Sequence, residues 1–394
     1  MPVSRSKLVV AVVLAVLLGL ATYLGSTVGV RALRSSEVSL TTDPGSVPEF
    51  VYNVPDTVPT TAAYGPVGPV SVVFAGTDVR TGLSGEQDNP WIAVSSQTGE
   101  YRALSAPHLP EPAADAVSVS QDGRVLAWGY DHGVVIYDPV EDEARELDGS
   151  VGASPLVGSF SPDGSHLAVF DGALRVIEVA SGEEVATLGE AGEREARQAV
   201  WTPDGEALTY VVDGRLVTHP WQSDARTTTP APIAQDATLA WQSSGKQLAA
   251  TQEAHGVRSV EIFDVSGDGR LEPVRTVSPD GYAQQELLGF TGESRVTVSA
   301  LTLETATLVR VYDMSTVDTR QPTQVMQLPG GGTNWVGAET VQVATQPLAA
   351  GSAAFEEPRW PWSDLSKLVA SIILAVFALG IYLTRPVSRR MRNR

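Results

Sequence analysis

A short turn motif recurs along this chain of 394 residues, and each copy stands between two apolar, β-rich stretches. The motif consists of a bulky residue, two polar or proline residues and a tight turn that ends in glycine. Its clear copies are 119–123 (VSQDG), 160–164 (FSPDG), 201–205 (WTPDG) and 241–245 (WQSSG). The bulky position continues less regularly at Phe290 and Trp335, and before the first copy at Phe74. These seven positions, here called the bulky column, are 40 to 49 residues apart.

A repeat of about 40–45 residues is typical of the four-stranded blades of a β-propeller. One repeat shows the scheme clearly, with strands expected at 156–160, 166–170, 174–179 and 184–188. Asp-Gly and Ser-Gly pairs stand between these strands and supply the positive φ angles that tight hairpins need. We therefore expect an all-β fold, a β-propeller of about seven blades.

The last repeat looks incomplete, because no outer strands follow residues 341–343. Propellers commonly close when a strand from one end of the chain completes the blade formed by the other end, which covers an open sheet edge. Residues 49–54 are the predicted strand for this closure.

Both ends of the chain carry apolar segments long enough to span a membrane. Residues 8–24 and 368–384 each form a run of 17 mainly apolar residues, which as a helix would cover most of a hydrocarbon core of ~30 Å. Five arginines in the last ten residues favour a cytoplasmic C-terminal tail. The alternative for the first segment is a cleaved signal peptide, although its apolar run exceeds the usual ~7–15 residues.

The predicted fold class is therefore an all-β propeller flanked by one N-terminal and one C-terminal transmembrane helix. The expected domains are an anchor or signal peptide at 8–30, a Pro/Thr/Ser-rich stalk at 31–68, the propeller at 69–345, a juxtamembrane segment at 346–364, a transmembrane helix at 365–384 and a basic cytoplasmic tail at 385–394. This arrangement predicts a bacterial cytoplasmic membrane protein with its propeller on the extracytoplasmic side.

The acidic residues are concentrated between the two apolar segments. All 46 Asp and Glu residues lie within 35–364, together with only 17 of the 27 Lys and Arg residues, so this part has a formal charge of −29. Such a charge disfavours nucleic acid and favours cations or basic partners, but the simpler interpretation, which we prefer, is a solvated acidic surface that keeps the domain soluble. The chain has no cysteine, which excludes disulfides and thiolate metal sites.

The turn copies resemble the WD-repeat-like blades of TolB-type propellers, in which a Ser-Pro-Asp-Gly turn is followed by a Leu-Ala strand. Here Leu167 and Ala168 follow the turn at 161–164, and similar pairs follow the turns at 121–123, 202–205 and 244–245. The Gly-His and Trp-Asp dipeptides of true WD repeats are absent. The resemblance implies a fold and says little about activity, because unrelated functions share this architecture.

One loop is a candidate calcium site. Residues 264–272 (DVSGDGRLE) place oxygen-bearing side chains at Asp264, Ser266, Asp268 and Glu272, and calcium binds six to eight oxygens in flexible loops. The loop looks like the calcium loops of integrin-type propellers, although Ser266 stands where a carboxylate is usual. The alternative is an ordinary hairpin turn without a metal.

No catalytic constellation is evident in the sequence. The five histidines lack metal-ligand spacing, and neither an HExxH nor a GxSxG motif occurs. The bulky column could suggest an aromatic binding surface, but its repetition in every blade favours packing between blades.

The sequence therefore predicts a non-enzymatic scaffold that binds a protein or a component of the cell envelope. One alternative is a hydrolase or lactonase with carboxylates gathered at the mouth of the central channel. Another is a ligand-sensing subunit of a membrane complex, which would need a deep pocket.

Overall fold

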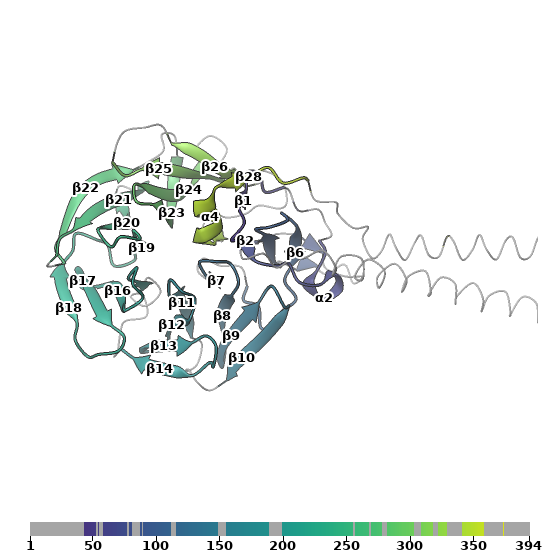
Figure 1. Ribbon diagram of the computed structural model, residues 1–394, viewed down its shortest axis with the longest axis horizontal. Coiled ribbons are helices and arrows are strands. Elements are labelled where there is room, and N and C mark those ends of the chain that lie inside the picture. The colour runs from purple at the N-terminus through teal and green to yellow at the C-terminus, as the bar shows by residue number, and fades with distance from the viewer. Residues whose placement is uncertain are drawn as a thin grey trace, which may run out of the picture.

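Six four-stranded antiparallel sheets are arranged as blades around a central axis (Figure 1). The computed structural model describes residues 43–52, 54, 58–76, 79–80, 87–88, 90–111, 116–148, 155–188, 199–254, 257–267, 269–277, 282–302, 309–317, 322–328, 341–357 and 373. The all-β propeller predicted from the repeat is confirmed in this part of the chain.

The blades are numbered from 1 to 6, and their strands are given from the central axis outwards. Blade 1 contains β27 (Gln342–Val343), β2 (Val70–Ala75), β5 (Trp91–Ser95) and β6 (Tyr101–Ala103), and blade 2 contains β7 (Ser118–Val119), β8 (Leu126–Tyr130), β9 (Gly133–Asp138) and β10 (Glu143–Asp148). Blade 3 contains β11 (Leu156–Phe160), β12 (His166–Phe170), β13 (Leu174–Glu178) and β14 (Glu184–Thr187), and blade 4 contains β15 (Val200–Trp201), β16 (Ala207–Val212), β17 (Arg215–Pro220) and β18 (Thr227–Pro230). Blade 5 contains β19 (Leu239–Trp241), β20 (Gln247–Ala254), β21 (Val257–Val265) and β22 (Leu271–Val277), and blade 6 contains β23 (Tyr282–Gly292), β24 (Arg295–Thr302), β25 (Val309–Ser315) and β26 (Thr323–Gln327).

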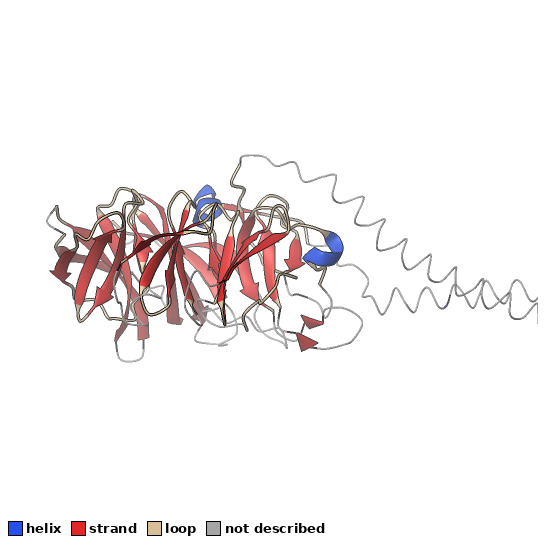
Figure 2. Ribbon diagram, turned by 90° about the horizontal axis from the view of Figure 1, so that it is seen from below, coloured by secondary structure: helices blue, strands red, loops and turns tan. Residues whose placement is uncertain are grey.

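Among the described residues, four short strands and two short helices lie outside the blades. They are β1 (Val47–Pro48), β3 (Val79–Arg80), β4 (Gln87–Asp88), β28 (Ser352–Ala353), α2 (Thr61–Tyr64) and α4 (Thr345–Ala350). Figure 2 shows that α4 lies on one face of the ring.

The recurring motif forms a turn that its own side chains stabilise. In blade 3 the Ser161 hydroxyl donates to the Asp163 carboxylate (2.6 Å) and accepts the His166 N–H (2.9 Å). The same carboxylate accepts the Ser165 N–H (3.0 Å), and Gly164 has a φ of 71°, which glycine adopts without strain. Blades 2 and 4 repeat these contacts with Ser120–Asp122 and Thr202–Asp204. The motif is therefore a structural device that reverses the chain between the first and second strands of a blade.

Apolar clusters join each blade to its neighbours. Between blades 3 and 4, for example, Phe170 and Leu174 pack in the same cluster as Trp201 and Leu208. Similar clusters combine residues of blades 1 and 2, 2 and 3, 4 and 5, 5 and 6, and 6 and 1. Both faces of each sheet are thus covered by other sheets, which explains why most strands are rich in apolar residues rather than strictly alternating.

The two ends of the described chain close the ring at blades 1 and 6. The inner strand of blade 1, β27, comes from the C-terminal side and pairs with β2 from the N-terminal side, with Val343 opposite Val72. In addition, β1 pairs in parallel with β28. Residues 49–51 then continue along the edge of β26, where Val51 donates its N–H to Gln327 (2.8 Å) and Gln327 donates its N–H to Glu49 (2.9 Å). Residues 47–51 and β28 are here called the clasp.

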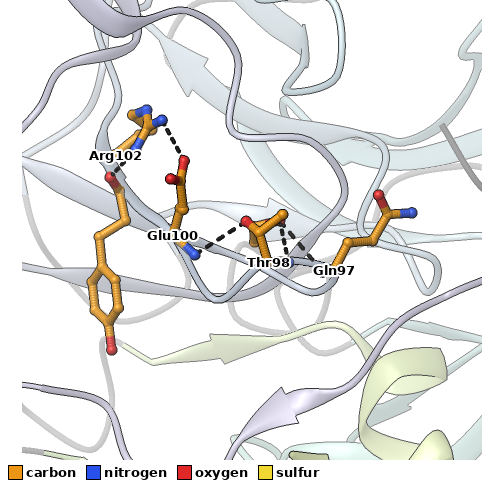
Figure 3. Close-up of polar contacts among 6 residues, drawn as sticks. Gln97, Thr98, Glu100 and Arg102 are labelled. Carbon is orange, nitrogen blue, oxygen red and sulfur yellow. Dashed lines mark hydrogen bonds and ion pairs between the residues drawn. The ribbon is translucent and has the colours of Figure 1, made fainter. Parts of the chain in front are cut away.

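The hairpin between β5 and β6, whose internal polar contacts Figure 3 shows, packs against the residues that flank the clasp. Ser95 Oγ accepts the N–H groups of Gln97 and Thr98, and the guanidinium of Arg102 donates to the Glu100 carboxylate (2.6 Å). Ser46 donates its N–H to the carbonyl of Ser96 (2.9 Å). Tight packing continues at Gly99, where an added Cβ would lie 2.4 Å from Cγ of Phe355.

The predicted number of seven blades was wrong, because the two ends of the repeat series share one blade. Phe74 was counted as the start of a blade, but it lies in β2, the second strand of blade 1, whose inner strand is β27. Trp335 lies outside the described residues. The predicted closing strand at 49–54 does not complete blade 1; its first residues instead extend the outer edge of blade 6 in parallel.

The two transmembrane helices of the predicted fold class, and with them a membrane as partner, are also corrected. Within the described residues no helix is long and apolar enough to cross a membrane, and the two helices outside the blades have four and six residues. The segments for which spans were predicted, 8–30 and 365–384, lie outside the described residues apart from residue 373. Part of the predicted stalk, residues 43–52, packs against the ring, and Val47 is fully buried.

We expect Val47→Ala to lower the free energy of unfolding by about 2 kcal/mol, because it removes two buried methyl groups and leaves a small void. Urea unfolding followed by circular dichroism measures this change. The matched control is Val185→Ala in β14, whose side chain is 42% exposed, with an expected change within about 0.5 kcal/mol. Equal midpoints for the two variants would contradict a stabilising clasp.

The carboxylate of Asp163, in the turn of blade 3, makes the stability of the folded protein depend on pH in the acid range. The Ser161 hydroxyl, followed by contacts with Ser165, lowers the pKa of Asp163 from 3.8 to about 2. A carboxylate with a lowered folded-state pKa stabilises the folded protein fully above its ordinary pKa, and this contribution is lost as the pH falls through the folded value. We expect Asp163→Asn to be less stable at neutral pH and to lose less stability than the unsubstituted protein between about pH 5 and about pH 2. If the urea midpoints of the two proteins fall equally over this pH range, the Asp163 carboxylate does not contribute to stability in this way.

Candidate functional site

The strand ends of the six blades lie on two opposite faces of the ring. In a sheet of four antiparallel strands, the turn after the first strand and the turn after the third lie at the same edge. The recurring motif turns therefore share one face, here called the turn face. The helix α4 lies on this face too, because Gln346 donates its N–H to the carbonyl of Gln121 in the turn of blade 2 (2.8 Å).

A cavity of about 510 Å³ occupies the centre of the ring. It is lined by the inner strands of all six blades and, at the turn face, by α4 and the motif turns. The turn residues that border it are Gln121, Pro162, Pro203 and Ser243, and the α4 residues are Thr345, Gln346 and Ala349. We refer to this space as the central cavity.

The lining of the central cavity carries no ionisable side chain among the described residues. Its surface combines apolar and aromatic groups with the neutral hydrogen-bonding groups of serine, threonine and glutamine. Such a surface can hold a ligand by van der Waals contact and neutral hydrogen bonds, but it offers no group for proton transfer near neutral pH.

Most of the bulky column lies at this cavity. Val119, Phe160, Trp201, Trp241 and Phe290 occupy or end the inner strands and line the cavity, whereas Phe74 is fully buried in β2. The indole N–H of Trp201 donates to the carbonyl of Ser159 in blade 3 (2.9 Å), and the indole N–H of Trp241 donates to Thr209 Oγ1 in blade 4 (3.2 Å). Each ring is thus fixed against the preceding blade, as the packing interpretation expected, and also presents an edge to the cavity.

The helix α4 brings three residues to the cavity that sequence reasoning missed. It follows directly after β27 and ends at Gly351, whose N–H donates to the carbonyl of Leu348 (3.2 Å). Pro347 and Leu348 are buried beneath it, while Gln346 and Ala349 are exposed. The propeller predicted from the sequence ends at residue 345, so residues 346–350 fall in the predicted juxtamembrane segment, and no motif in 345–350 (TQPLAA) signals their place at the cavity.

The candidate calcium residues are only partly described, since Asp268 lies outside the described residues. Asp264 and Glu272 stand opposite each other on β21 and β22. The Asp264 carboxylate accepts a hydrogen bond from Gln247 Nε2 (2.9 Å), and the Ser266 hydroxyl donates to the carbonyl of Arg270 (3.0 Å). In the part of the chain that the structure describes, no group of three or more His, Cys, Asp or Glu residues is placed to hold a metal ion. The calcium site stays a prediction.

No family model matches this chain, and no curated protein matches it. Among solved structures it is similar to a TolB-type protein from Agrobacterium tumefaciens, with 15% identity and a TM-score of 0.42, over 59% of this chain and 91% of the other. It is also similar to the Cps50 (Swd1) β-propeller domain from Myceliophteria thermophila, with 16% identity and a TM-score of 0.41, over 62% and 81% of the two chains. A chain of a nidogen/laminin complex shows 12% identity and a TM-score of 0.46, over 70% and 98%.

The resemblance to TolB-type propellers that the turn motif predicted is confirmed at the level of the fold by the ring of four-stranded blades, and a TolB-type protein is among these neighbours. At this low identity the likeness concerns the fold, and the blade architecture itself follows from the strand pairing described above.

The members of the bulky column are buried to different degrees, so replacing them should lower the free energy of unfolding by different amounts. Trp201 is 5% exposed and lies in the cluster between blades 3 and 4, so we expect Trp201→Ala to cost about 3–5 kcal/mol of unfolding free energy. Trp241 is less buried, and Trp241→Ala should cost less. Urea unfolding of both variants checks the order, and a smaller loss at Trp201 than at Trp241 would contradict it.

Proposed function

We propose that this propeller binds a partner protein on its turn face, with the mouth of the central cavity as the centre of contact, and that it does not itself catalyse a reaction. The observation that carries the proposal is the uncharged, aromatic-rich lining contributed by all six inner strands and α4. Rings of this kind offer a broad rigid surface, because each blade is fixed by its neighbours through an apolar cluster.

The hydrolase or lactonase alternative needs several carboxylates gathered at the mouth of the channel. Glycoside hydrolases, for example, place two carboxyl groups roughly 5–9.5 Å apart across the scissile bond. The described lining of the central cavity contains no Asp or Glu. The turns around its mouth do carry carboxylates, but in the part of the chain that the structure describes no three of them lie close enough together to hold a metal ion. This difference favours binding over hydrolysis at this position.

A second candidate function is the binding of a small uncharged ligand. The cavity volume of about 510 Å³ falls within the roughly 300–1,000 Å³ of small-molecule sites. In that case the ring would serve as a sensing subunit. We keep the extracytoplasmic location of the propeller, predicted from the sequence, as part of the proposal, although the binding role does not depend on it.

The proposal is tested by blocking the cavity mouth without disturbing the core. Ala349 on α4 is exposed and lines the cavity, so Ala349→Trp places an indole at the mouth. Ala350, the next residue, is also exposed but does not line the cavity, so Ala350→Trp is the matched control.

Each variant and the unsubstituted chain are isolated from the producing cells after chemical crosslinking, and bound proteins are identified by mass spectrometry. We expect one partner in stoichiometric amount, crosslinked to the turn face, with the unsubstituted chain and Ala350→Trp, and at least a tenfold loss with Ala349→Trp. Equal recovery with Ala349→Trp, or crosslinks confined to the opposite face, would exclude the proposed contact. Recovery of the protein alone would shift the assignment to the small-ligand candidate.

A further inference from the structure

We infer that the segment bound at the central cavity is basic: a loop or tail of the partner in which Lys or Arg residues flank an uncharged residue that enters the cavity. This inference rests on the proposed function and names the chemistry of the partner. It is carried by the contrast between the uncharged cavity and the charged turns that surround its mouth.

The motif turns around the mouth carry an excess of carboxylates. In the turns at 120–125, 161–166, 202–207, 242–247 and 291–294, the acidic residues are Asp122, Asp163, Asp204, Glu206 and Glu293. The basic residues of the same turns are Arg124 and Lys246, and Arg295, which directly follows the blade 6 turn, is ion-paired with Asp313 (2.6 Å). Arg124 lies 4.0 Å from the Asp122 carboxylate, so it neutralises charge within its own turn. We call the five carboxylates the acidic rim.

The carboxylates of the acidic rim are held in place by the fold. Those of Asp122, Asp163 and Asp204 each accept a hydrogen bond from the hydroxyl two residues earlier. The hydroxyl of Thr202 lowers the pKa of Asp204, as that of Ser161 lowers the pKa of Asp163, so these hydrogen bonds favour the charged form of both carboxylates. The hydrogen bonds that make the turn therefore also fix the position of a carboxylate in blades 2, 3 and 4, and in blade 2 its charge is offset by Arg124.

The central cavity favours an uncharged group of the ligand, whereas the acidic rim favours cationic groups of the same ligand. An ion that enters the uncharged cavity loses hydration without gaining an oppositely charged partner, which disfavours charged groups inside. Cations that remain at the exposed rim keep most of their hydration and are attracted by the carboxylates, mainly through faster association and specificity. A second copy of this chain is a poor occupant, since residues 35–364 have a formal charge of −29 and repel one another.

The test uses peptides as probes because the partner is unidentified. A phage library of random 12-residue peptides is selected against the 394-residue chain, and enriched peptides are synthesised with a fluorescent label for anisotropy titrations. We expect enrichment of Lys or Arg on both sides of an uncharged residue, and a Kd that rises with salt concentration.

Five variants distinguish the rim, the cavity and general charge. Ala349→Trp should abolish binding and Ala350→Trp should preserve it. Glu206→Lys, on the rim, should weaken binding by about fivefold, an effect typical of one exposed charge pair. Glu253→Lys makes the same charge change at an exposed position at the far end of β20, towards the opposite face, and should leave the Kd within about twofold. Lys246→Glu should lower the Kd by about the same factor by which Glu206→Lys raises it.

Two outcomes overturn the inference in different ways. Acidic or uncharged peptides whose binding is lost in Ala349→Trp would refute the basic segment but leave the cavity as a binding site. Peptides that bind Ala349→Trp as well as Ala350→Trp, or no enrichment at all, would refute both the inference and the proposed contact. If Ala349→Trp shows a lowered urea midpoint, Gln346→Trp on the same helix replaces it as the blocking variant.

Discussion

The packing of each sheet against two neighbours is the interaction on which the rest of this structure depends. No blade could bury its apolar faces alone, and six clusters between blades supply the burial that each sheet lacks. The ring must therefore be closed, since an open series would leave one face of a terminal blade in water. Closure is achieved by two residues of β27 at the inner edge and by the clasp at the outer edge.

The internal blades were predictable from sequence because local chemistry determines them. The strands of blade 3 were placed to within one residue, since hydroxyl, carboxylate and glycine at fixed spacing specify the turn that separates them. The closing blade was not predictable in this way. Its inner strand, Gln342–Val343, carries no motif and pairs with a strand about 270 residues earlier, a choice that depends on how many blades complete the circle.

In the candidate site, too, the features set by local sequence were predictable and those set by the arrangement of distant strands were not. The bulky column predicted which side chains pack between blades, because packing within a repeat is a local property. That the central cavity is uncharged depends on the alignment of six inner strands around an axis, together with α4 from outside the repeats. A single sequence shows the residues of each strand but not which of them converge. In the same way, the acidic rim is visible only when the turns are known to share one face.

The parallel pairing of β1 with β28 has a mechanical consequence. The chain enters the ring at the N-terminal end of β1 and leaves it at the C-terminal end of β28. When parallel strands are pulled from these opposite ends, they slide along each other, so the hydrogen bonds between them bear tension together rather than breaking one after another. Tension between the segments before and after the ring is thus carried in shear by the clasp, and the blades behind it are shielded until the clasp gives way.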